Sequence, residues 1–329
     1  MNEENLKHGA LPDPKDDRDY IYEALGTPSV SDVKWDEGFD IEEKLGYKLK
    51  PKNQHFSYSC VGQAYAIYKA VKRAINPDYN EVSAKSIYSL IALGNNQGAY
   101  LRDGADTLKI VGALLEAKLP SFNLSGVATE EHLTNKDWFT EQARKEMLAL
   151  RIHDYFRITT WTIDGFAKAI RDGDGMVAGV VGNNNGTWMS IYPKPPLTTT
   201  PQGQTWGHAI YFGKFRLKDG KKEIGCLNSW GDNVGENGWQ WLGEEWFAEN
   251  GRWLFSPWVL IYTNNINNMT NESAKILKDA NSSAVGVWLP AISEDVLKSY
   301  CLNMGINLPF SSDGKIDWQN AINGEFQLK

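Results

Sequence analysis

The chain has 329 residues, of which 42% are hydrophobic and 23% charged, so it can bury a substantial core and is not disordered as a whole. Its net charge of −7 arises from 41 acidic and 34 basic residues, and the basic ones are scattered along the sequence. A nucleic-acid or other polyphosphate partner is therefore not expected. No apolar run approaches the ~18 residues of a membrane span, and the first residues lack a signal-peptide pattern, so we expect a cytoplasmic protein that does not enter a membrane.

The cysteines and histidines give no sign of a metal site or a disulfide scaffold. The chain holds three cysteines, Cys60, Cys226 and Cys301, a small and odd number that fits reduced thiols. No Cys-x-x-Cys pair is present and the five histidines do not cluster, so we predict neither a metal nor a cofactor. Cys226 lies in an apolar run and Cys301 in an amphipathic one, and both patterns are typical of packing cysteines.

Composition divides the chain into four segments. Residues 1–32 are polar, acidic and turn-rich, and we expect an arm that lies extended on the domain. The main body spans 33–262, an asparagine-rich linker spans 263–271, and a small tail spans 272–329. The short arm and the asparagine-rich linker favour a bacterial or bacteriophage origin.

The tail has the periodicity of short helices but too few residues for a strong core of its own. Val296, Leu297, Tyr300, Cys301 and Met304 fall on one helical face. A segment of this size buries only a marginal core alone, so we expect the tail to dock on the body or on a partner. It is either a helical accessory module that binds a protein partner or positions substrate, or a passive brace.

Within the body, helical periodicity comes first and strand-like runs follow. Apolar residues after Cys60 recur on one face as far as Ile75, and Asn76-Pro77 ends this predicted helix. Further helices are predicted at 83–93, 107–117 and 136–150, and strands at 176–181, 209–212 and 224–227. This order predicts an α+β fold with a helical N-terminal half, an antiparallel β-rich C-terminal half and a small helical tail.

Cys60 is the candidate nucleophile. It occupies the first turn of its predicted helix, where unpaired backbone N–H groups and the positive end of the dipole favour a thiolate, the reactive form. Gln54 lies six residues upstream, and its amide could donate to an oxyanion together with the backbone N–H of Cys60. The alternative for any single cysteine is a small buried residue at the start of a helix.

A predicted hairpin carries a histidine and an asparagine. Asp219-Gly220 between two apolar runs is a strong signal for a two-residue turn, which sets the register of the flanking strands. In that register Asn228 faces about Tyr211, near His208 but not opposite it, and a bulge or a wider loop would close the offset. The hairpin therefore offers a base and an amide that can orient it.

Four motifs, in this order and at these spacings, resemble the papain family of cysteine peptidases. They are Asn53-Gln54 with Ser59-Cys60, Gly207-His208-Ala209, Asn228-Ser229-Trp230-Gly231, and Gly235-Glu236-Asn237-Gly238-Trp239. The 148 residues from Cys60 to His208 match the family's spacing. Val33-Lys34-Trp35-Asp36 is similar to the family's entry segment, so the resemblance covers 33–262, about 70% of the chain. It implies a two-lobed papain-like fold.

The resemblance also implies catalytic roles for the matching residues. Cys60 would be the nucleophile, and His208 would be the general base and then the general acid. Gln54 would supply the oxyanion hole, and Asn228 would hold the imidazole of the histidine.

Three further residues match positions that shape the substrate site in the family. Trp230 would shield the histidine–asparagine hydrogen bond from water. Gly98 and Ala99, followed by Tyr100, would form a glycine-containing edge that pairs with the substrate backbone.

The chain departs from the family pattern around its nucleophile. Val61-Gly62-Gln63 follow Cys60 in place of the usual tryptophan and small residue, and Phe56-Ser57-Tyr58 replaces a glycine-rich run. The disulfide cysteines of secreted relatives are missing, and since only about 30 residues precede the domain we expect no long inhibitory propeptide. If the enzyme is held in check, we expect the acidic arm, a partner or the compartment to restrain it.

Three functions are compatible with these motifs. The first is a cysteine endopeptidase that cleaves peptide or protein substrates through an acyl-thioester intermediate, and Gln54 with the Asn228 motif favours it. The second is a catalytically inactive papain-like binding or structural module, which the altered sequence around Cys60 motivates. The third is a cell-wall peptide hydrolase, which the tryptophan content and the small tail would suit.

Overall fold

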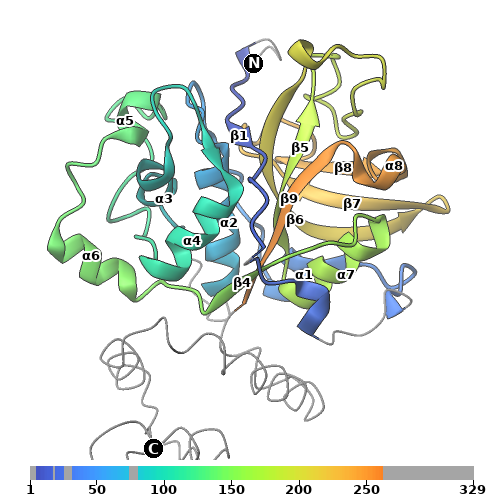
Figure 1. Ribbon diagram of the computed structural model, residues 1–329, viewed down its shortest axis with the longest axis horizontal. Coiled ribbons are helices and arrows are strands. Elements are labelled where there is room, and N and C mark those ends of the chain that lie inside the picture. Colours follow the sequence, from blue (N-terminus) through green and yellow to red (C-terminus); the bar gives the residue numbers. More distant parts are fainter. Residues whose placement is uncertain (1–4, 18, 26–31, 74–80, 262–329) are drawn as a thin grey trace, which may run out of the picture. The chain divides into compact units, whose positions relative to one another are not determined.

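The computed structural model describes residues 5–17, 19–25, 32–73 and 81–261, which form the predicted α+β fold (Figure 1). The described helices are α1 (Ile41–Leu45), α2 (Cys60–Arg73), α3 (Ala84–Ile91), α4 (Leu101–Ile110), α5 (Glu130–Thr134), α6 (Glu141–Leu148), α7 (Ile163–Gly173) and α8 (Ala248–Gly251). The described strands are β1 (Ala10–Leu11), β2 (Phe39–Asp40), β3 (Ala99–Tyr100), β4 (Asp154–Arg157), β5 (Met176–Gly182), β6 (Trp206–Lys218), β7 (Lys221–Leu227), β8 (Trp239–Gly243) and β9 (Leu254–Ile261). Helices α2 to α6 lie on one side and most of the strands on the other.

Helix α2 is the centre of the helical half. It begins at Cys60, as predicted, and its apolar side chains are buried against α3 and the sheet. Helix α3 begins after Ser83, whose side chain accepts a hydrogen bond from the Ser86 backbone N–H and so caps the helix. Gly62 lets the two helices approach closely, because a Cβ there would lie 2.6 Å from the Cβ of Tyr88.

The helix predicted at 107–117 is wrong in its bounds. The structure places α4 at Leu101–Ile110, and the residues after it are irregular. Gly112 has a φ of 91° and packs against the Met147 carbonyl, so the chain turns there instead of continuing as a helix. Ala113 is nevertheless fully buried, and this explains why the apolar pattern extended past the true end of the helix.

Two other helical segments differ from the prediction. The helix expected at 136–150 is present only as α6, which Thr140 caps through its side chain. Helices α5 and α7 were not predicted, although Thr129 and Thr162 cap them in the same manner. In both cases the N-cap threonine was the missed sequence signal.

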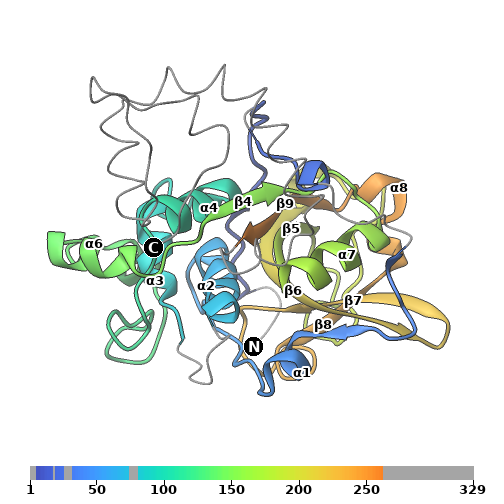
Figure 2. The same ribbon diagram turned by 90° about the horizontal axis from the view of Figure 1, so that it is seen from below.

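The β half is built around one antiparallel sheet with strand order β4-β9-β5-β6-β7-β8, and β2 also pairs with β6 (Figure 2). The strands predicted at 176–181, 209–212 and 224–227 form the cores of β5, β6 and β7. Lys218 pairs with Lys221 across a two-residue turn, which confirms the predicted hairpin. The register then shifts between Phe212 and Lys214, so a β-bulge lies where the sequence required an adjustment.

Helix α2 packs against the sheet and thereby joins the two halves. The Tyr68 hydroxyl donates to the Gly173 carbonyl over 2.8 Å, and its ring lies 5.4 Å from that of Tyr211 on β6. The buried ammonium of Lys72 lies 3.3 Å from the carboxylate of Asp174. These contacts hold the second half of α2 against β6 and the end of α7.

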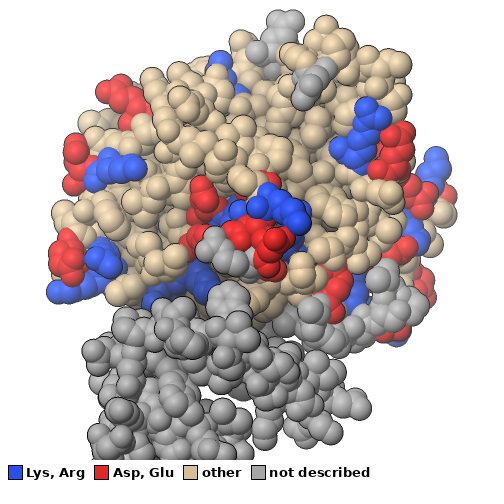
Figure 3. Space-filling view, viewed as in Figure 1, with Lys and Arg blue, Asp and Glu red and all other residues tan. Residues whose placement is uncertain are grey.

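The surface of the described residues carries mixed charge. Lysine and arginine lie interspersed with aspartate and glutamate on the face shown in Figure 3. Among these residues no helix is long and apolar enough to cross a membrane, and no cluster of three or more histidine, cysteine or acidic side chains could hold a metal ion. The predicted linker, the tail and Cys301 lie outside the described residues.

Candidate active site

Cys60 lies at the first residue of α2 and is fully buried. Burial raises the pKa of its thiol to about 11, although the backbone N–H groups of Ala209 and Gly9, among others, favour the thiolate. The sequence predicted a favoured thiolate at this helix start, and in this arrangement that prediction is wrong. Desolvation outweighs the helix dipole because the chain covers the sulfur completely.

His208 and Asn228 meet on the hairpin of β6 and β7. The imidazole Nε2 lies 2.9 Å from the Asn228 Oδ1, and both side chains are fully buried. The bulge in β6 shifts the register by one residue, so that Leu227 pairs with Tyr211 and brings Asn228 one position nearer to the histidine. Burial lowers the pKa of His208 to about 4, against the opposing effect of the Asn228 hydrogen bond.

Trp230 covers this pair. Its ring stacks on the His208 imidazole with centroids 4.2 Å apart and planes 17° from parallel. The tryptophan is itself 2% exposed, so water does not reach the ring from that side. The position matches the shielding role that the sequence resemblance implied for Trp230.

The side-chain amide of Gln54 is held by hydrogen bonds at both of its ends. Its Oε1 accepts a 2.8 Å hydrogen bond from the Ser229 hydroxyl, and the two backbone carbonyls that Nε2 faces fix the orientation of the amide, because they only accept. Its Nε2 donates to the Ser57 carbonyl and to the Lys7 carbonyl, each over 2.9 Å. Since Gly9, two residues beyond Lys7, reaches the sulfur of Cys60, the amide and the thiol face the same stretch of chain.

That stretch belongs to the N-terminal arm, which runs between the two halves (Figure 1). Strand β1 pairs in parallel with β3, and the Ala99 N–H donates to the Gly9 carbonyl over 2.8 Å. A Cβ on Gly98 would lie 1.9 Å from the Gly9 oxygen, and one on Gly207 would lie 2.3 Å from the Ala10 oxygen. Gly98 and Ala99 therefore pair with the extended backbone of the chain's own arm, and their pairing with a substrate stays a prediction.

The arm also inserts a histidine that the sequence gave no reason to select. The His8 ring stacks on Trp206 at 3.7 Å with planes 3° from parallel, and it meets His208 and Trp230 edge-on at 6.0 and 5.6 Å. Burial, with the nearby His208 and Lys7, lowers the pKa of His8 to about 2. No motif marks this contact, since it depends on how the arm folds back over His208 and Cys60.

The residues just before Cys60 differ in how far they are exposed to solvent. Phe56 is 60% exposed, whereas Ser57 and Ser59 are fully buried and their hydroxyls lie 2.7 Å apart. Gln63 on α2 extends this polar chain by donating to the Ser59 hydroxyl over 3.1 Å. The loop before the nucleophile is thus held by buried hydrogen bonds where the family has glycine flexibility.

The fold is similar to those of solved cysteine proteases. Xylellain, a cysteine protease from Xylella fastidiosa, matches with a TM-score of 0.64 and 21% sequence identity over 79% of this chain and 97% of that chain. Digestive procathepsin L2 proteinase from the larval midgut of Tenebrio molitor gives 0.56 and 18% over 79% of each chain. Bromelain protease from Ananas comosus, in complex with the E64 inhibitor, gives 0.53 and 16% over 70% of this chain and 100% of that chain.

No protein-family model and no curated protein matches the sequence. At these identities, likeness to solved structures concerns the path of the backbone alone. That path combines N-terminal helices, an antiparallel β-rich C-terminal half and the contact of α2 with β6. The described chain therefore has the fold of the papain-like cysteine proteases.

Proposed function

We propose that this protein is a cysteine peptidase that hydrolyses peptide bonds through an acyl-thioester intermediate. The observation that carries the proposal is the convergence of three elements on one site. Cys60 at the start of α2 faces the backbone N–H of Ala209, the neighbour of His208 on β6, and His208 is hydrogen-bonded to Asn228. Gln54, from the loop before α2, accepts a hydrogen bond from Ser229, the neighbour of Asn228.

In the proposed reaction His208 accepts the thiol proton and the sulfur of Cys60 attacks the carbonyl carbon of the peptide bond. The Gln54 Nε2 and the backbone N–H of Cys60 stabilise the oxyanion that forms. The amine leaves with the proton held by His208, and the acyl group remains on sulfur as a thioester. Water, deprotonated by His208, then releases the acid and restores the thiol. Asn228 keeps the imidazole in place throughout.

An extended peptide is the substrate class that the site favours. The edge formed by Gly98 and Ala99 already hydrogen-bonds to the backbone of β1, and backbone pairing does not depend on side-chain identity. The mixed charge on the face in Figure 3 offers no field of one sign for a polyanion. Peptide or protein chains are therefore the substrates that this edge favours.

An inactive papain-like module is the second candidate, and the cover over the nucleophile favours it. Cys60 is fully buried beneath the arm, and its raised pKa leaves it a thiol at neutral pH. A protein that never released the arm would bind no substrate. The two proposals thus differ in whether the arm can move away from Cys60.

Labelling with the thiol-directed epoxide E64 separates them. We expect a mass increase at Cys60 in the variant Gly9→Val, whose added side chain displaces the arm, and much weaker labelling when His208→Ala is added. The Cys60→Ala variant is the control: it should lose both labelling and hydrolysis while its free energy of unfolding changes by no more than ~1–2 kcal/mol. Absence of labelling and of casein cleavage in Gly9→Val would support the inactive module.

A further inference from the structure

A fully buried glutamine lies behind the histidine–asparagine pair. Gln240 is on β8, where it pairs in register with Cys226 of β7. Its Oε1 accepts a 2.8 Å hydrogen bond from the Asn228 Nδ2. Its Nε2 donates to the backbone carbonyls of Trp188 over 2.7 Å and Ser190 over 2.8 Å. All of its side-chain hydrogen-bonding atoms are thereby engaged.

These partners fix which way the Gln240 amide points. A carbonyl oxygen only accepts hydrogen bonds, so the nitrogen of the glutamine must face Trp188 and Ser190. Its oxygen must then face Asn228, and this oxygen in turn requires the nitrogen of the asparagine. The Asn228 Oδ1 is left to face His208, and the Ser229 N–H, 2.7 Å away, supports the same orientation.

The orientation of Asn228 determines the tautomer of the histidine. Because the Oδ1 only accepts, the Nε2 of His208 must carry the proton in the 2.9 Å contact between them. The Nδ1 then has the free lone pair, and it is buried without a hydrogen-bond partner among the described residues. A base needs this lone pair to accept a proton from the thiol.

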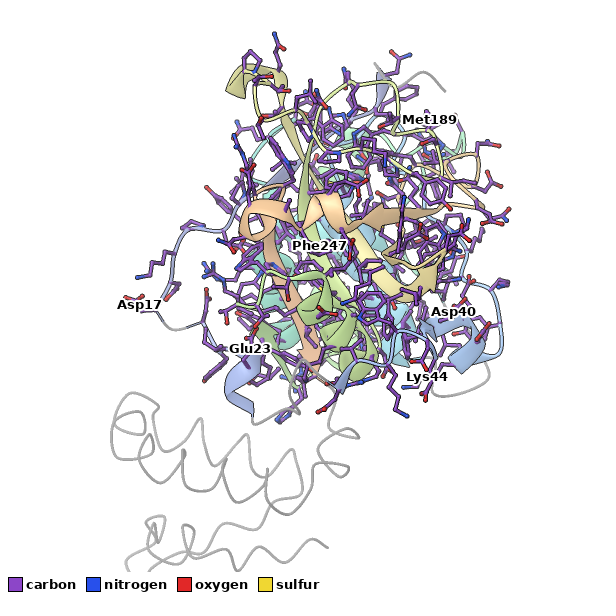
Figure 4. All side chains as sticks on the ribbon, turned by 90° about the vertical axis from the view of Figure 1, so that its right-hand side faces the viewer. Asp17, Glu23, Asp40, Lys44, Met189 and Phe247 are labelled. Atoms are coloured by element: carbon purple, nitrogen blue, oxygen red, sulfur yellow. The ribbon has the colours of Figure 1, made fainter. Side chains whose placement is uncertain are left out.

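We propose that Gln240 is a positioning residue that sets the tautomer of His208 through Asn228. The chain of contacts begins at the backbone carbonyls of the loop at 188–190 and ends at the imidazole. Met189, in the middle of this loop, lies at the end of the β half opposite to Asp40 and Lys44 (Figure 4). The loop at 188–190, far from α1, thus fixes which nitrogen of His208 carries the proton.

The same contacts give Gln240 a structural role that a test must separate from the positioning role. By binding the loop, Gln240 also supports Trp188, whose ring lies 4.8 Å from Trp206 and 5.8 Å from Trp230. A variant could therefore lose activity because the aromatic cluster shifts. Only an effect that requires Asn228 identifies the positioning role.

The inference rests on the proposed peptidase function for its kinetic test. We expect Gln240→Leu to lower kcat for a peptide substrate about tenfold or more with little change in KM, because the buried Asn228 Nδ2 loses its acceptor and the Ser229 N–H alone is left to hold the asparagine toward His208. In the Asn228→Ala background the same substitution should have almost no further effect on kcat. Equal losses in both backgrounds would overturn the proposal and leave Gln240 a structural residue.

A spectroscopic readout is independent of activity. In protein labelled with ¹⁵N-histidine, the shifts of the two His208 nitrogens, assigned by comparison with His208→Ala, should report the Nε2–H tautomer in the wild type and a mixture in Gln240→Leu. Gln240→Glu, protonated in this buried position, keeps an oxygen for the Asn228 Nδ2 and an O–H for a carbonyl of the 188–190 loop, so it should retain the wild-type tautomer even if Gln240→Leu does not fold. An unchanged tautomer in folded Gln240→Leu would overturn the inference, whether or not the protein cleaves peptides.

Discussion

Burial determines the protonation of the two central residues. It raises the pKa of Cys60 to about 11 and lowers the pKa of His208 to about 4, so at neutral pH the pair is a thiol beside a neutral imidazole. A thiolate beside an imidazolium would need the opposite order of pKa values. Since the arm supplies part of the cover over both groups, we expect its displacement to precede catalysis.

The Gln54 amide is the proposed side-chain donor to the oxyanion. We expect Gln54→Ala to reduce kcat about 10²-fold, because one donor to the oxyanion is lost, while KM changes little. Steady-state kinetics on a short fluorogenic peptide measures both. Gln142→Ala, an exposed glutamine on α6, is the control and should leave both constants unchanged. An effect confined to KM would show that Gln54 binds substrate instead.

His208 and Asn228 should differ in the size of their effects. His208→Ala removes the group that transfers the proton, whereas Asn228→Ala removes only the group that orients it. We therefore expect the loss of kcat to be larger for His208→Ala, measured on the same peptide. The reverse order would exchange the roles of base and orienting residue and refute the assignment.

At the scale of elements, the N-terminal arm covers the candidate site. Its β1 strand occupies the edge of β3, the Lys7 carbonyl takes the Gln54 donor, and Gly9 lies over Cys60. A substrate would need these same groups. The arm can lie this close because a Cβ on Gly9 would be only 2.0 Å from the Tyr58 carbonyl oxygen.

Displacing the arm should therefore activate the protein. In Gly9→Val the added side chain collides with the Tyr58 backbone, and overpacking of this kind weakens docking by ~1–3 kcal/mol. We expect kcat/KM for peptide cleavage to rise about tenfold or more. Lys15→Ala, at an 84% exposed side chain of the same arm, is the control and should leave kcat/KM unchanged. Equal rates for both variants and the wild type would mean that the arm does not limit access.

Acid should release the arm through His8. The docked arm holds the pKa of His8 at about 2, and release restores its ordinary value of about 6.5. The released state binds the proton, so docking is strongest above pH 6.5 and weakens as pH falls below it, by up to about tenfold per pH unit. Burial also lowers the pKa of His208, which acts in the same direction, whereas burial raises the pKa of Asp13, which opposes release.

The ratio of kcat/KM between Gly9→Val and the wild type measures this effect, because the pH dependence of catalysis is common to both. We expect the ratio to decrease as the pH is lowered from 7.5 to 5.5, because the arm of the wild type is then released as well. His8→Phe keeps a ring for Trp206 but cannot titrate, so in its background the ratio should depend less on pH. The prediction fails if the ratio is constant with pH in the presence of His8.

At the scale of the whole molecule, the site exists because two halves meet. The proposed nucleophile comes from α2 and the proposed base from β6, so we expect any loss of packing between these elements to separate the two groups. The Tyr68 hydroxyl connects three elements here: it lies on α2, donates to the Gly173 carbonyl at the end of α7, and accepts from the Leu260 N–H of β9 over 3.2 Å. Its removal leaves buried backbone groups without that partner.

We expect Tyr68→Phe to lower the free energy of unfolding by about 2 kcal/mol, the cost of leaving buried polar groups unsatisfied. Chemical denaturation followed by tryptophan fluorescence measures the change. Tyr20→Phe, at a 48% exposed tyrosine, provides the control and should change stability by less than ~0.5 kcal/mol. Equal stability of Tyr68→Phe and the wild type would show that this hydroxyl does not hold the halves together.

The sequence by itself determined the elements whose signals are local. The helix after Cys60, the two-residue turn at Asp219-Gly220 and the α+β order follow from periodicity and turn chemistry, and the structure confirms them. The order and spacing of Gln54, Cys60, His208 and Asn228 also selected them as candidate catalytic residues, and their roles stay a prediction.

Only the tertiary structure decided what depends on distant contacts. The turn that shortens α4 at Gly112 results from packing on Met147, which lies 35 residues away in the chain. The thiol pKa of Cys60 is governed by burial rather than by the local helix dipole. The places of Gln240 behind Asn228 and of His8 on Trp206 carry no sequence motif. Desolvation and hydrogen bonding across the fold are set by which segments meet, and a linear pattern does not encode this directly.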